Sequence, residues 1–464
     1  MRFNRIRVTL TASCVIAAAV AVAGGGAASA SNSKKGISVL YSYNYVQDTD
    51  ALANAWWKSV ENQWKTANPS TPLTPVGVGG TDIDEMNKAA ILFRSPSTTP
   101  CVIQMPTTYV GEFASSGYLA SLNSYVSGSS APAFWTGMPK AVQEMSTIGG
   151  KVYAVNLGNT DGGIVYNKLM LEKAGIKMPW VPKTWADIIA AAKAVHKAEP
   201  KVYALWAETG VASGPTGILQ GVGNLIFGST NPQMFDSKTG KWVVDSPGLA
   251  ATLKFYQTVA KDGLGAPVSQ LLNADSLAEP PALMQKGKLA ISFGANWFPS
   301  TWLPGSAEPW PAASKDVGAA PMPTENGQAP GIASTIGGWA YAISATCTNK
   351  ASAFKFITLL ESPANQLSMA TESGFIPPDT SVATSKAFDT SSLFQLQFSR
   401  YAAIGTPFPN NANFTVYTRA INTATEDFAI NPNTETVSSA LSTMKSLITQ
   451  QLGSNSVETI KSSG

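Results

Sequence analysis

Histidine and cysteine are nearly absent from this chain, which has one histidine, His196, and three cysteines among 464 residues. Ordinary zinc sites draw four ligands mostly from these two residue types, so the sequence predicts no metal site. A Ser-His-Asp triad would have to use His196, which lies in the middle of a predicted helix, away from every candidate loop. Nucleophilic hydrolysis is therefore disfavoured, and we expect no catalytic residues.

Charged residues are also scarce, at 13% of the chain, and the formal net charge is only +3. Three arginines within the first seven residues supply that excess, so the chain after residue 30 has a net charge of 3 − 3 = 0. Nucleic-acid binding needs a concentrated Lys/Arg surface, and no basic cluster remains to provide one. There is no Walker lysine motif, and VGVGGTD lacks the spacing of a dinucleotide-binding loop, so we expect no cofactor.

The first 30 residues have the three parts of a secretory signal peptide. A basic start is followed by an apolar middle at 8–23 and by the small-residue cleavage site Ala28-Ser29-Ala30. The apolar middle is shorter than the ~20 residues of a membrane span, and an uncleaved anchor is the alternative. Cys14 lies inside the apolar run, whereas a lipid-modified cysteine would follow it. The sequence predicts export to the periplasm or cell surface after cleavage at Ala30, without a lipoprotein anchor.

Strand and helix patterns alternate in the next part of the chain. Apolar runs at 36–43, 73–78 and 102–105 predict strands, and helical spacing of apolar residues near 53–64 and 82–92 predicts the helices between them. This order is typical of a doubly wound α/β layer, in which ligands bind at the carboxyl ends of the strands. The 434 residues after the signal peptide (464 − 30) are too many for one core, so we expect two domains.

The segment 150–198 is the most informative. Residues 152–157 and 164–166 are short apolar runs that predict two buried strands, separated by the polar, glycine-rich stretch GNTDGG. We predict that stretch to be a ligand loop. Further along, Thr184 and Asp187 form a capping box ahead of another helix.

These motifs, in this order, resemble those of the type-1 bacterial extracellular solute-binding proteins of ABC importers, which include maltose-binding proteins. Residues 150–198 are similar to the family's first crossing strand, its ligand loop, its Tyr-Asn-Lys strand end and its Pro/Thr/Trp helix entry. The segments TPCVIQMPTTYVGEFASSGYLASL, MQKGKLAISFGANWF, STIGGWAYAI and SGFIPPDT parallel further family segments across most of the chain. The resemblance implies a two-lobed type II periplasmic-binding-protein fold, α/β in class, with a central sheet flanked by helices in each lobe.

The resemblance also implies the limits of the lobes. Residues 31–158 and 337–374 are expected to form the N-terminal lobe, and residues 159–336 and 375–464 the C-terminal lobe. The chain then crosses between the lobes three times, and the lobes close on a ligand by a hinge motion. The hinge is expected near Gly158, Ile336 and Ser373.

Candidate ligand residues follow the predicted strands. A sugar site needs flat aromatic rings against the C–H faces of the sugar and polar partners for its hydroxyls, because a buried hydroxyl without a partner is costly. Trp297 is the strongest candidate, since it follows the strand AISFG at the family's ligand position. Trp339 has the alternative of pointing into the core while only Gly338 contacts the ligand. The predicted ligand residues are Tyr43, Asn44, Tyr45, Thr107, Thr108, Tyr109, Asn159, Thr160, Asp161, Trp206, Glu208, Asn296, Trp297, Gly338 and Trp339.

The resemblance implies a monomeric carbohydrate-binding component of an ABC importer, which delivers its sugar to the permease subunits without catalysis. The alternative is a secreted carbohydrate-active enzyme that uses Asp161 and Glu208 as a carboxylate pair, which glycosidases hold ~5–10 Å apart. A third possibility keeps the fold and changes the ligand. A phosphate ester would need Lys or Arg in the candidate loops, and a cation would need several carboxylates there. Because those loops offer neither, we expect a neutral sugar.

Cys101 and Cys347 remain after the signal peptide, in a compartment that permits pairing. In the family's first lobe the returning strand resembles an antiparallel neighbour of the third strand. The resemblance therefore puts Cys101, at the start of one strand, beside Cys347, at the end of the other. Antiparallel neighbours have Cα atoms ~4.5–5.5 Å apart, within the reach of a disulfide. We expect the bridge, and two buried free thiols are the alternative.

Overall fold

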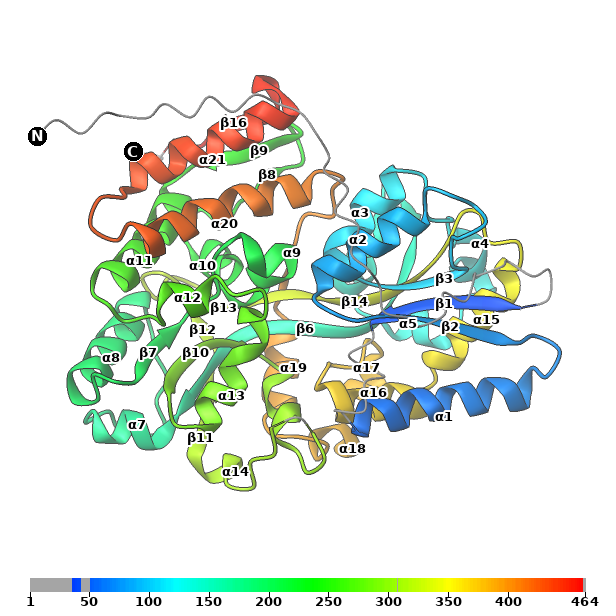
Figure 1. Cartoon of the computed structure of the whole chain (residues 1–464), viewed down its shortest axis with the longest axis horizontal. Helices are drawn as coiled ribbons and strands as arrows, with labels where there is room; N and C mark the ends of the chain where they lie inside the picture. Colours follow the sequence, from blue (N-terminus) through cyan, green and yellow to red (C-terminus); the bar gives the residue numbers. More distant parts are fainter. Residues whose placement is uncertain (1–35, 43–50, 307, 462–464) are drawn as a thin grey trace, which may run out of the picture.

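One long strand, β6 (Ala154–Asn167), passes from one lobe of the molecule to the other and takes part in the sheets of both (Figure 1). Its first half pairs antiparallel with β14 (Thr335–Ile343), and its second half pairs antiparallel with β10 (Leu289–Ala295). The computed structural model describes residues 36–42, 51–306 and 308–461. The two lobes expected from the sequence are present, but their sheets are joined through β6.

The first lobe, on the right of Figure 1, has a sheet in which β1 pairs in parallel with both β2 and β3, while β14 returns antiparallel beside β3. Its strands are β1 (Ile37–Ser42), β2 (Leu73–Val78), β3 (Val102–Pro106), β4 (Thr147–Ile148) and β5 (Lys151–Val152). Its helices are α1 (Ala51–Ala67), α2 (Asp82–Leu92), α3 (Thr107–Ser115), α4 (Asn123–Val126), the 3₁₀ turn η2 (Gly128–Ser130), α5 (Ala133–Gly137), α6 (Lys140–Glu144), α15 (Lys350–Leu360) and α16 (Pro363–Ser373).

The tryptophans of α1 explain why this helix packs where it does. Trp57 and Trp64 meet Phe356 of α15 edge to face, with ring centroids 6.4 and 5.3 Å apart. Trp57 also stacks on Tyr41 of β1 at 4.4 Å. Each aromatic ring removed from water contributes a large apolar area, so these contacts fix α1 against the sheet. Trp56 is buried as well, and all three tryptophans are core residues.

The second lobe, on the left of Figure 1, has β10 between β6 and the parallel strand β7, and β11 on the end of β6. Its strands are β7 (Tyr203–Trp206), β8 (Phe235–Asp236), β9 (Lys241–Asp245), β11 (Val317–Ala320), β12 (Met322–Pro323), β13 (Ile332–Ala333), β15 (Thr406–Pro407) and β16 (Val457–Thr459). Its helices begin with α7 (Lys168–Lys173), α8 (Trp185–Ala198), η3 (Val211–Ser213), α9 (Gly214–Gly217), η4 (Ile218–Gln220), α10 (Val222–Gly228), α11 (Pro247–Lys261), α12 (Val268–Leu271), η5 (Ser276–Ala278) and α13 (Glu279–Gln285). They continue with η6 (Phe298–Trp302), α14 (Ala313–Asp316), α19 (Gln395–Ala402), α20 (Phe414–Ile430), α21 (Val437–Leu452) and η7 (Ser454–Ser456). Two short helices, α17 (Thr380–Ala383) and α18 (Lys386–Asp389), lie beside α16.

The predicted ligand loop GNTDGG is wrong, because these residues form the middle of β6 and are buried. The glycines serve close packing instead of a turn. A Cβ atom on Gly158 would lie 2.7 Å from the Cβ of Phe375, and one on Gly162 would collide with the side chain of Asn224. Where side chains from other elements approach the backbone of a strand this closely, the strand requires glycine, just as a turn does.

The segments that join the lobes lie side by side. Asp161 of β6 pairs with Ile336 of β14, and Asn159 exchanges two backbone hydrogen bonds with Ile376, at 2.8 and 2.9 Å. These pairings surround the positions at which the hinge is expected, while the exact limits of the lobes stay a prediction.

A disulfide joins Cys101 and Cys347 in the first lobe, with Cα atoms 4.7 Å apart. Cys101 comes directly before β3, Cys347 comes shortly after β14, and these two strands pair antiparallel. The backbone N–H of Ser344 donates to the carbonyl of Cys101 at 2.9 Å and extends that pairing to the bridge. In the part of the chain that the structure describes, no helix is long and apolar enough to cross a membrane.

Candidate ligand-binding site

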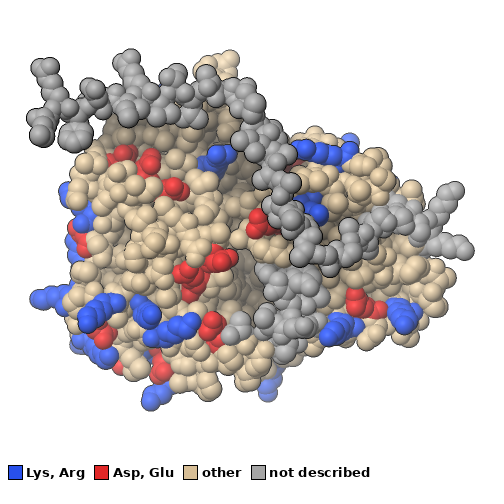
Figure 2. All heavy atoms as spheres, viewed as in Figure 1, with Lys and Arg blue, Asp and Glu red and all other residues tan. Residues whose placement is uncertain are grey.

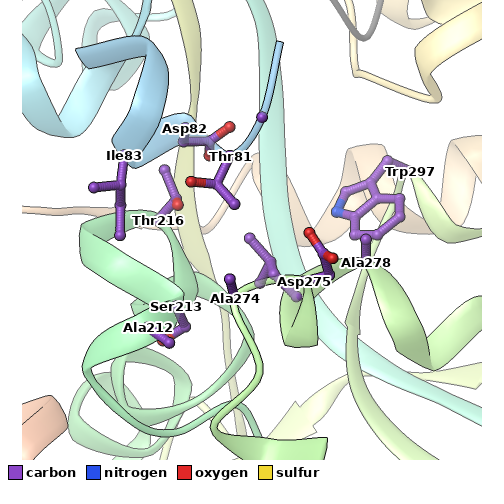
Figure 3. Close-up of a pocket in the computed structure, with 12 residues that line it drawn as sticks. Thr81, Asp82, Ile83, Ala212, Ser213, Thr216, Ala274, Asp275, Ala278 and Trp297 are labelled. Atoms are coloured by element: carbon purple, nitrogen blue, oxygen red, sulfur yellow. The ribbon is translucent and has the colours of Figure 1, made fainter. Parts of the chain in front are cut away.

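A pocket of about 160 Å³ opens between the two lobes (Figure 3). The start of α2 forms one wall, and three segments of the second lobe, around η3 and α9, around η5 and just after β10, form the other. The residues that line it are Gly80, Thr81, Asp82, Ile83, Ala212, Ser213, Thr216, Ala274, Asp275, Leu277, Ala278 and Trp297.

A capping box at the start of α2 shapes the first wall. The hydroxyl of Thr81 accepts from the N–H of Asp84 at 3.3 Å, and the Asp84 carboxylate accepts from the N–H of Thr81 at 2.9 Å. This reciprocal bonding fixes where the helix begins after β2. Asp82 is then the first helical residue, where the positive end of the helix dipole favours a carboxylate.

Asp82 links the two walls. The hydroxyl of Thr216, from α9 of the other lobe, hydrogen-bonds its carboxylate. Burial raises the pKa of Asp82 to about 6, and the bond from Thr216 offsets part of that rise. A carboxylate in this position can accept hydrogen bonds from a bound hydroxyl or ammonium group.

Trp297 forms the side of the pocket opposite Asp82 in Figure 3. It follows β10 directly, and its half-buried ring packs edge to face on Phe298, with centroids 4.6 Å apart. That contact holds the indole in place while one part of it stays accessible. The structure thus puts the strongest sequence candidate in the lining, and its contact with a ligand stays a prediction.

Asp275 is the second carboxylate of the lining. It lies on a solvent-exposed segment directly before η5 and, in Figure 3, between Asp82 and Trp297. The hydroxyls of Thr81, Ser213 and Thr216 complete the polar part of the wall. Together these groups offer hydrogen-bond acceptors and donors around one aromatic ring, which is the combination that a sugar requires.

Thr107, Thr108 and Tyr109 were predicted in a loop after the third strand, and that prediction is wrong. They form the first turn of α3, which starts immediately after Pro106. Their exposed fractions are 6%, 8% and 8%, and none of them lines the pocket. Proline fixes its own φ and is compatible with the position just before a helix, so the strand can turn into a helix without a loop.

Asn159, Thr160 and Asp161 also lie outside the pocket lining, since they are buried in β6. Asn296 is buried beside them and bonds only to backbone. Its amide donates to the carbonyl of Asn159 at 3.1 Å and accepts from the N–H of Asp161 at 3.1 Å. The geometry gives these residues a role in joining the crossing segments.

Gly338 and Trp339 belong to β14 and lie at its irregular pairing with β6. Gly338 has a φ of 137°, and a Cβ atom there would collide with the carbonyl oxygen of Gly158. Trp339 is half-buried and packs against the core of the first lobe, as the sequence alternative proposed. Neither residue is part of the described pocket lining.

Trp206 and Glu208 form a buried pair behind the pocket wall. The indole of Trp206 donates to one Glu208 carboxylate oxygen at 2.9 Å, and the hydroxyl of Ser276 donates to the other at 2.6 Å. Burial raises the pKa of Glu208 to about 7, and these two bonds offset part of the rise. Ser276 directly follows the lining residue Asp275. Its bond to Glu208 therefore holds the segment that carries Asp275 in place.

Two groups of predicted residues lie beyond what the structure describes. Tyr43, Asn44 and Tyr45 fall outside the described residues, and so does the predicted signal peptide at 1–30. Of the predicted ligand residues that are described, the pocket brings in Trp297.

Sequence reasoning missed Thr81, Asp82, Ser213, Thr216 and Asp275 as lining residues. A signal for the first two was present, because TDID is a capping box directly after the strand 73–78, at the carboxyl end where ligands bind. The other three carry no such signal. Ser213 ends η3, Thr216 lies in α9 and Asp275 directly precedes η5, and none of them directly follows a strand.

The carboxylates of the rival enzyme hypothesis do not face this pocket. Asp161 is fully buried, and among the described residues neither of its carboxylate oxygens has a hydrogen-bond partner. Burial raises its pKa well above the usual range. Glu208 is committed to Trp206 and Ser276. Within residues 36–42, 51–306 and 308–461, no group of three or more His, Cys, Asp or Glu side chains is placed to hold a metal ion.

The family comparison matches 318 residues of the chain, 78–395, to the model described as bacterial extracellular solute-binding protein. A relative from Deinococcus radiodurans, described as a probable ABC transporter-binding protein, is 28% identical over 243 residues. That match covers 51% of this chain and 54% of the relative, so it spans about half the length of the curated protein.

Solved structures resemble this chain over most of its length. Maltose-bound MalE3 from T. maritima has a TM-score of 0.73 at 20% identity and covers 89% of this chain and 98% of its own. A solute-binding protein from Thermotoga lettingae, bound to α-D-tagatose, has a TM-score of 0.72 at 18% identity and covers 89% of this chain and 100% of its own. These likenesses confirm the predicted two-lobed α/β fold.

Proposed function

Since this chain belongs to the bacterial extracellular solute-binding proteins, we propose that it binds a carbohydrate between its lobes and delivers it to the permease of an ABC importer. The observation that carries the proposal is the pocket lined from both lobes, with Trp297 facing polar groups of α2. An indole face suits the C–H surface of a sugar ring, and the carboxylate and hydroxyl groups suit its hydroxyls.

The similar proteins support the choice of ligand class. MalE3 of T. maritima was solved with maltose, and the Thermotoga lettingae protein with α-D-tagatose. A single sugar ring matches the size of the described pocket better than a long oligosaccharide does, because about 160 Å³ is below the usual range for drug-sized ligands.

Delivery to a permease follows from the same proposal. The chain acts outside the cytoplasm as a monomer, exported by the signal peptide at 1–30, and closure of its lobes around the sugar presents one composite surface to the transporter. Catalysis has no part in it, since Asp161 and Glu208 are buried away from the pocket lining.

The test is a thermal-shift screen of the mature protein against mono- and oligosaccharides, followed by calorimetry on the hits. A ligand present at about 100 times its Kd adds ~2.7 kcal/mol to the free energy of unfolding, which a melting curve resolves. Chromatography of the sugar after long incubation separates the two functions, because a binding protein returns it unchanged and an enzyme consumes it. Turnover of the hit, or no stabilisation by any saccharide, would overturn the proposal.

A further inference from the structure

The pocket between the lobes carries negative charge with no positive counterpart. Asp82 and Asp275 line it from opposite walls, and the described lining contains no lysine, arginine or histidine. Figure 2 shows acidic side chains bordering the hollow in the middle of the molecular face, while Lys and Arg side chains lie farther from it. Within the described lining, the negative charge comes from these two carboxylates.

Two further carboxyl groups lie directly behind the walls, and their raised pKa values mean that they hold their protons more tightly than free carboxyl groups and respond to the charge of the lining. Glu85, one helical turn after Asp82, has an exposed fraction of 2%, and among the described residues neither of its carboxylate oxygens has a hydrogen-bond partner. Burial, and then the neighbouring charge of Asp82, raises the pKa of Glu85 well above its usual range. On the other wall, Glu208 is buried behind Ser276, next to Asp275.

We propose that the carbohydrate bound here carries a protonated amine, as an amino sugar does. This inference rests on the carbohydrate-binding function proposed above and specifies the charge of the ligand. The hydroxyls of a neutral sugar can donate hydrogen bonds to Asp82 and Asp275, but they bring no opposite charge. A carboxylate that loses water to a bound ligand is stabilised more by a counter-charge than by a neutral donor. An ammonium group supplies that charge together with three hydrogen-bond donors.

The aromatic wall fits the same ligand. The ring face of Trp297 attracts a cation placed over it, in addition to packing against the sugar ring. The neutral sugar expected from the sequence rested on loops in which only Asp161 and Glu208 offered carboxylates. The folded chain turns both of those away from the pocket and brings in Asp82 and Asp275 instead.

The experiment compares sugars that differ only in the charge of one substituent. Calorimetry near neutral pH compares the Kd of glucosamine with those of glucose and N-acetylglucosamine. It also compares deacetylated chitosan oligosaccharides with their N-acetylated counterparts. We expect the amine to bind at least about tenfold more tightly than its neutral partner at low salt. High salt should reduce that advantage, because mobile ions screen charge pairs that are not fully buried.

Charge-removing variants locate the effect. Asp82→Asn and Asp275→Asn should each reduce the preference for the amine, while melting curves establish that both variants are folded. Glu144→Gln is the matched control, because it removes one negative charge from an exposed side chain of α6 outside the pocket lining.

The outcomes separate this inference from the function on which it rests. Equal or tighter binding of the neutral sugars overturns the inference and leaves carbohydrate binding in place. Binding of putrescine without binding of any saccharide overturns the carbohydrate function, and so does the absence of heat from every sugar. A tenfold preference that survives in both Asn variants overturns the role of the two carboxylates.

Discussion

The side-chain amide of Asn296 donates a hydrogen bond to the carbonyl of Gly374 at 2.7 Å and so ties the end of β10 to the segment that follows α16. The same side chain also donates to Asn159 and accepts from Asp161, both in β6. One fully buried residue therefore bonds to two of the segments that join the lobes. This contact depends on both ends of one small amide, which no apolar side chain can replace.

Replacing Asn296 with leucine should lower the free energy of unfolding by about 2–4 kcal/mol, since each buried polar group left without a partner costs ~1–3 kcal/mol. The carbonyl of Asn159 keeps its bond from Ile376, so the cost comes mainly from Gly374 and Asp161. Urea unfolding measures the change. The control is Asn326→Ala, at an exposed turn residue, and equal stability of the two variants would refute the assigned role.

Trp297→Ala should weaken sugar binding by about tenfold, or ~1.4 kcal/mol, because the stacking face is lost. Trp310→Ala is a matched control: this residue is likewise half-buried against the same core cluster, where it packs on Trp302 at 5.4 Å, but it lies outside the pocket lining. Both variants should lose similar stability, while only the first should lose affinity. Calorimetry with any confirmed ligand decides, and unaltered affinity in Trp297→Ala would sink the assignment.

The fold was largely predictable from local patterns. The strands at 37–42, 73–78 and 102–106 are apolar runs with clear limits, and the capping box of Thr184 and Asp187 forms as expected. Apolar runs and capping boxes depend only on residues that are close in the sequence, so they can be predicted from the sequence alone.

The pocket was much less predictable, because its walls meet only through the arrangement of the lobes. Nothing near Asp275 in the sequence indicates that it lies in the same pocket as Asp82, 193 positions away (275 − 82). The loop predicted around Gly162 is wrong for a similar reason, because Gly162 is required by close contact with Asn224, which lies in another element. Trp297 could be predicted as a lining residue because it comes just after β10, and ligands bind at the carboxyl ends of strands.

The stability of the protein should fall as pH rises from mildly acidic to neutral. Burial raises the pKa of Glu208 from 4.5 to about 7 and that of Asp82 from 3.8 to about 6. The folded state therefore holds these protons more tightly than the unfolded state does. The resulting stabilisation is complete below the unfolded pKa values and is lost as pH rises through the folded ones.

Melting temperatures between about pH 4.5 and 8 measure this effect, and they should be highest at the acidic end. Glu208→Gln removes one titrating group while keeping an amide oxygen as acceptor, so its profile should be flatter across the same range. A wild-type melting temperature that rises toward pH 8 would contradict the direction given for these pKa values.

Removing the bridge between Cys101 and Cys347 should lower the free energy of unfolding by about 5 kcal/mol in the chain-entropy account. The reason is that the bridge closes a loop with a sequence separation of 246. The double variant Cys101→Ser/Cys347→Ser, compared with the parent by urea unfolding, gives the size of the effect. Mass spectrometry of the non-reduced, alkylated mature protein shows whether the two cysteines are bonded. Two alkylated thiols would mean that the bridge does not form in solution.

Closure of the lobes should depend on Gly214, which begins α9 and lies against Ile83 of α2. A Cβ atom on Gly214 would lie 2.8 Å from Cγ1 of Ile83 in the opposite lobe, and Gly214 has a φ of +62°. An alanine there requires either the Ile83 side chain or the wall that carries it to shift. We expect Gly214→Ala to weaken sugar binding by about tenfold, although it removes no lining group.

Gly453→Ala separates closure from backbone strain. Gly453 has φ and ψ of +86° and 160°, close to the +62° and −166° of Gly214, and a Cβ atom there would meet nothing within 4 Å. Both substitutions put a side chain in a backbone conformation that is almost exclusive to glycine, at a cost of ~1–3 kcal/mol each. Only Gly214→Ala also obstructs the opposite lobe, so only that variant should lose affinity.

Small-angle scattering completes this test. The radius of gyration of the parent and of Gly453→Ala should decrease when a confirmed sugar saturates the protein, because the lobes close on it. Gly214→Ala should contract less under the same conditions. Equal contraction and equal affinity in all three proteins would show that Ile83 and Gly214 do not limit closure, and an unchanged radius in the parent would argue against a hinge at these crossings altogether.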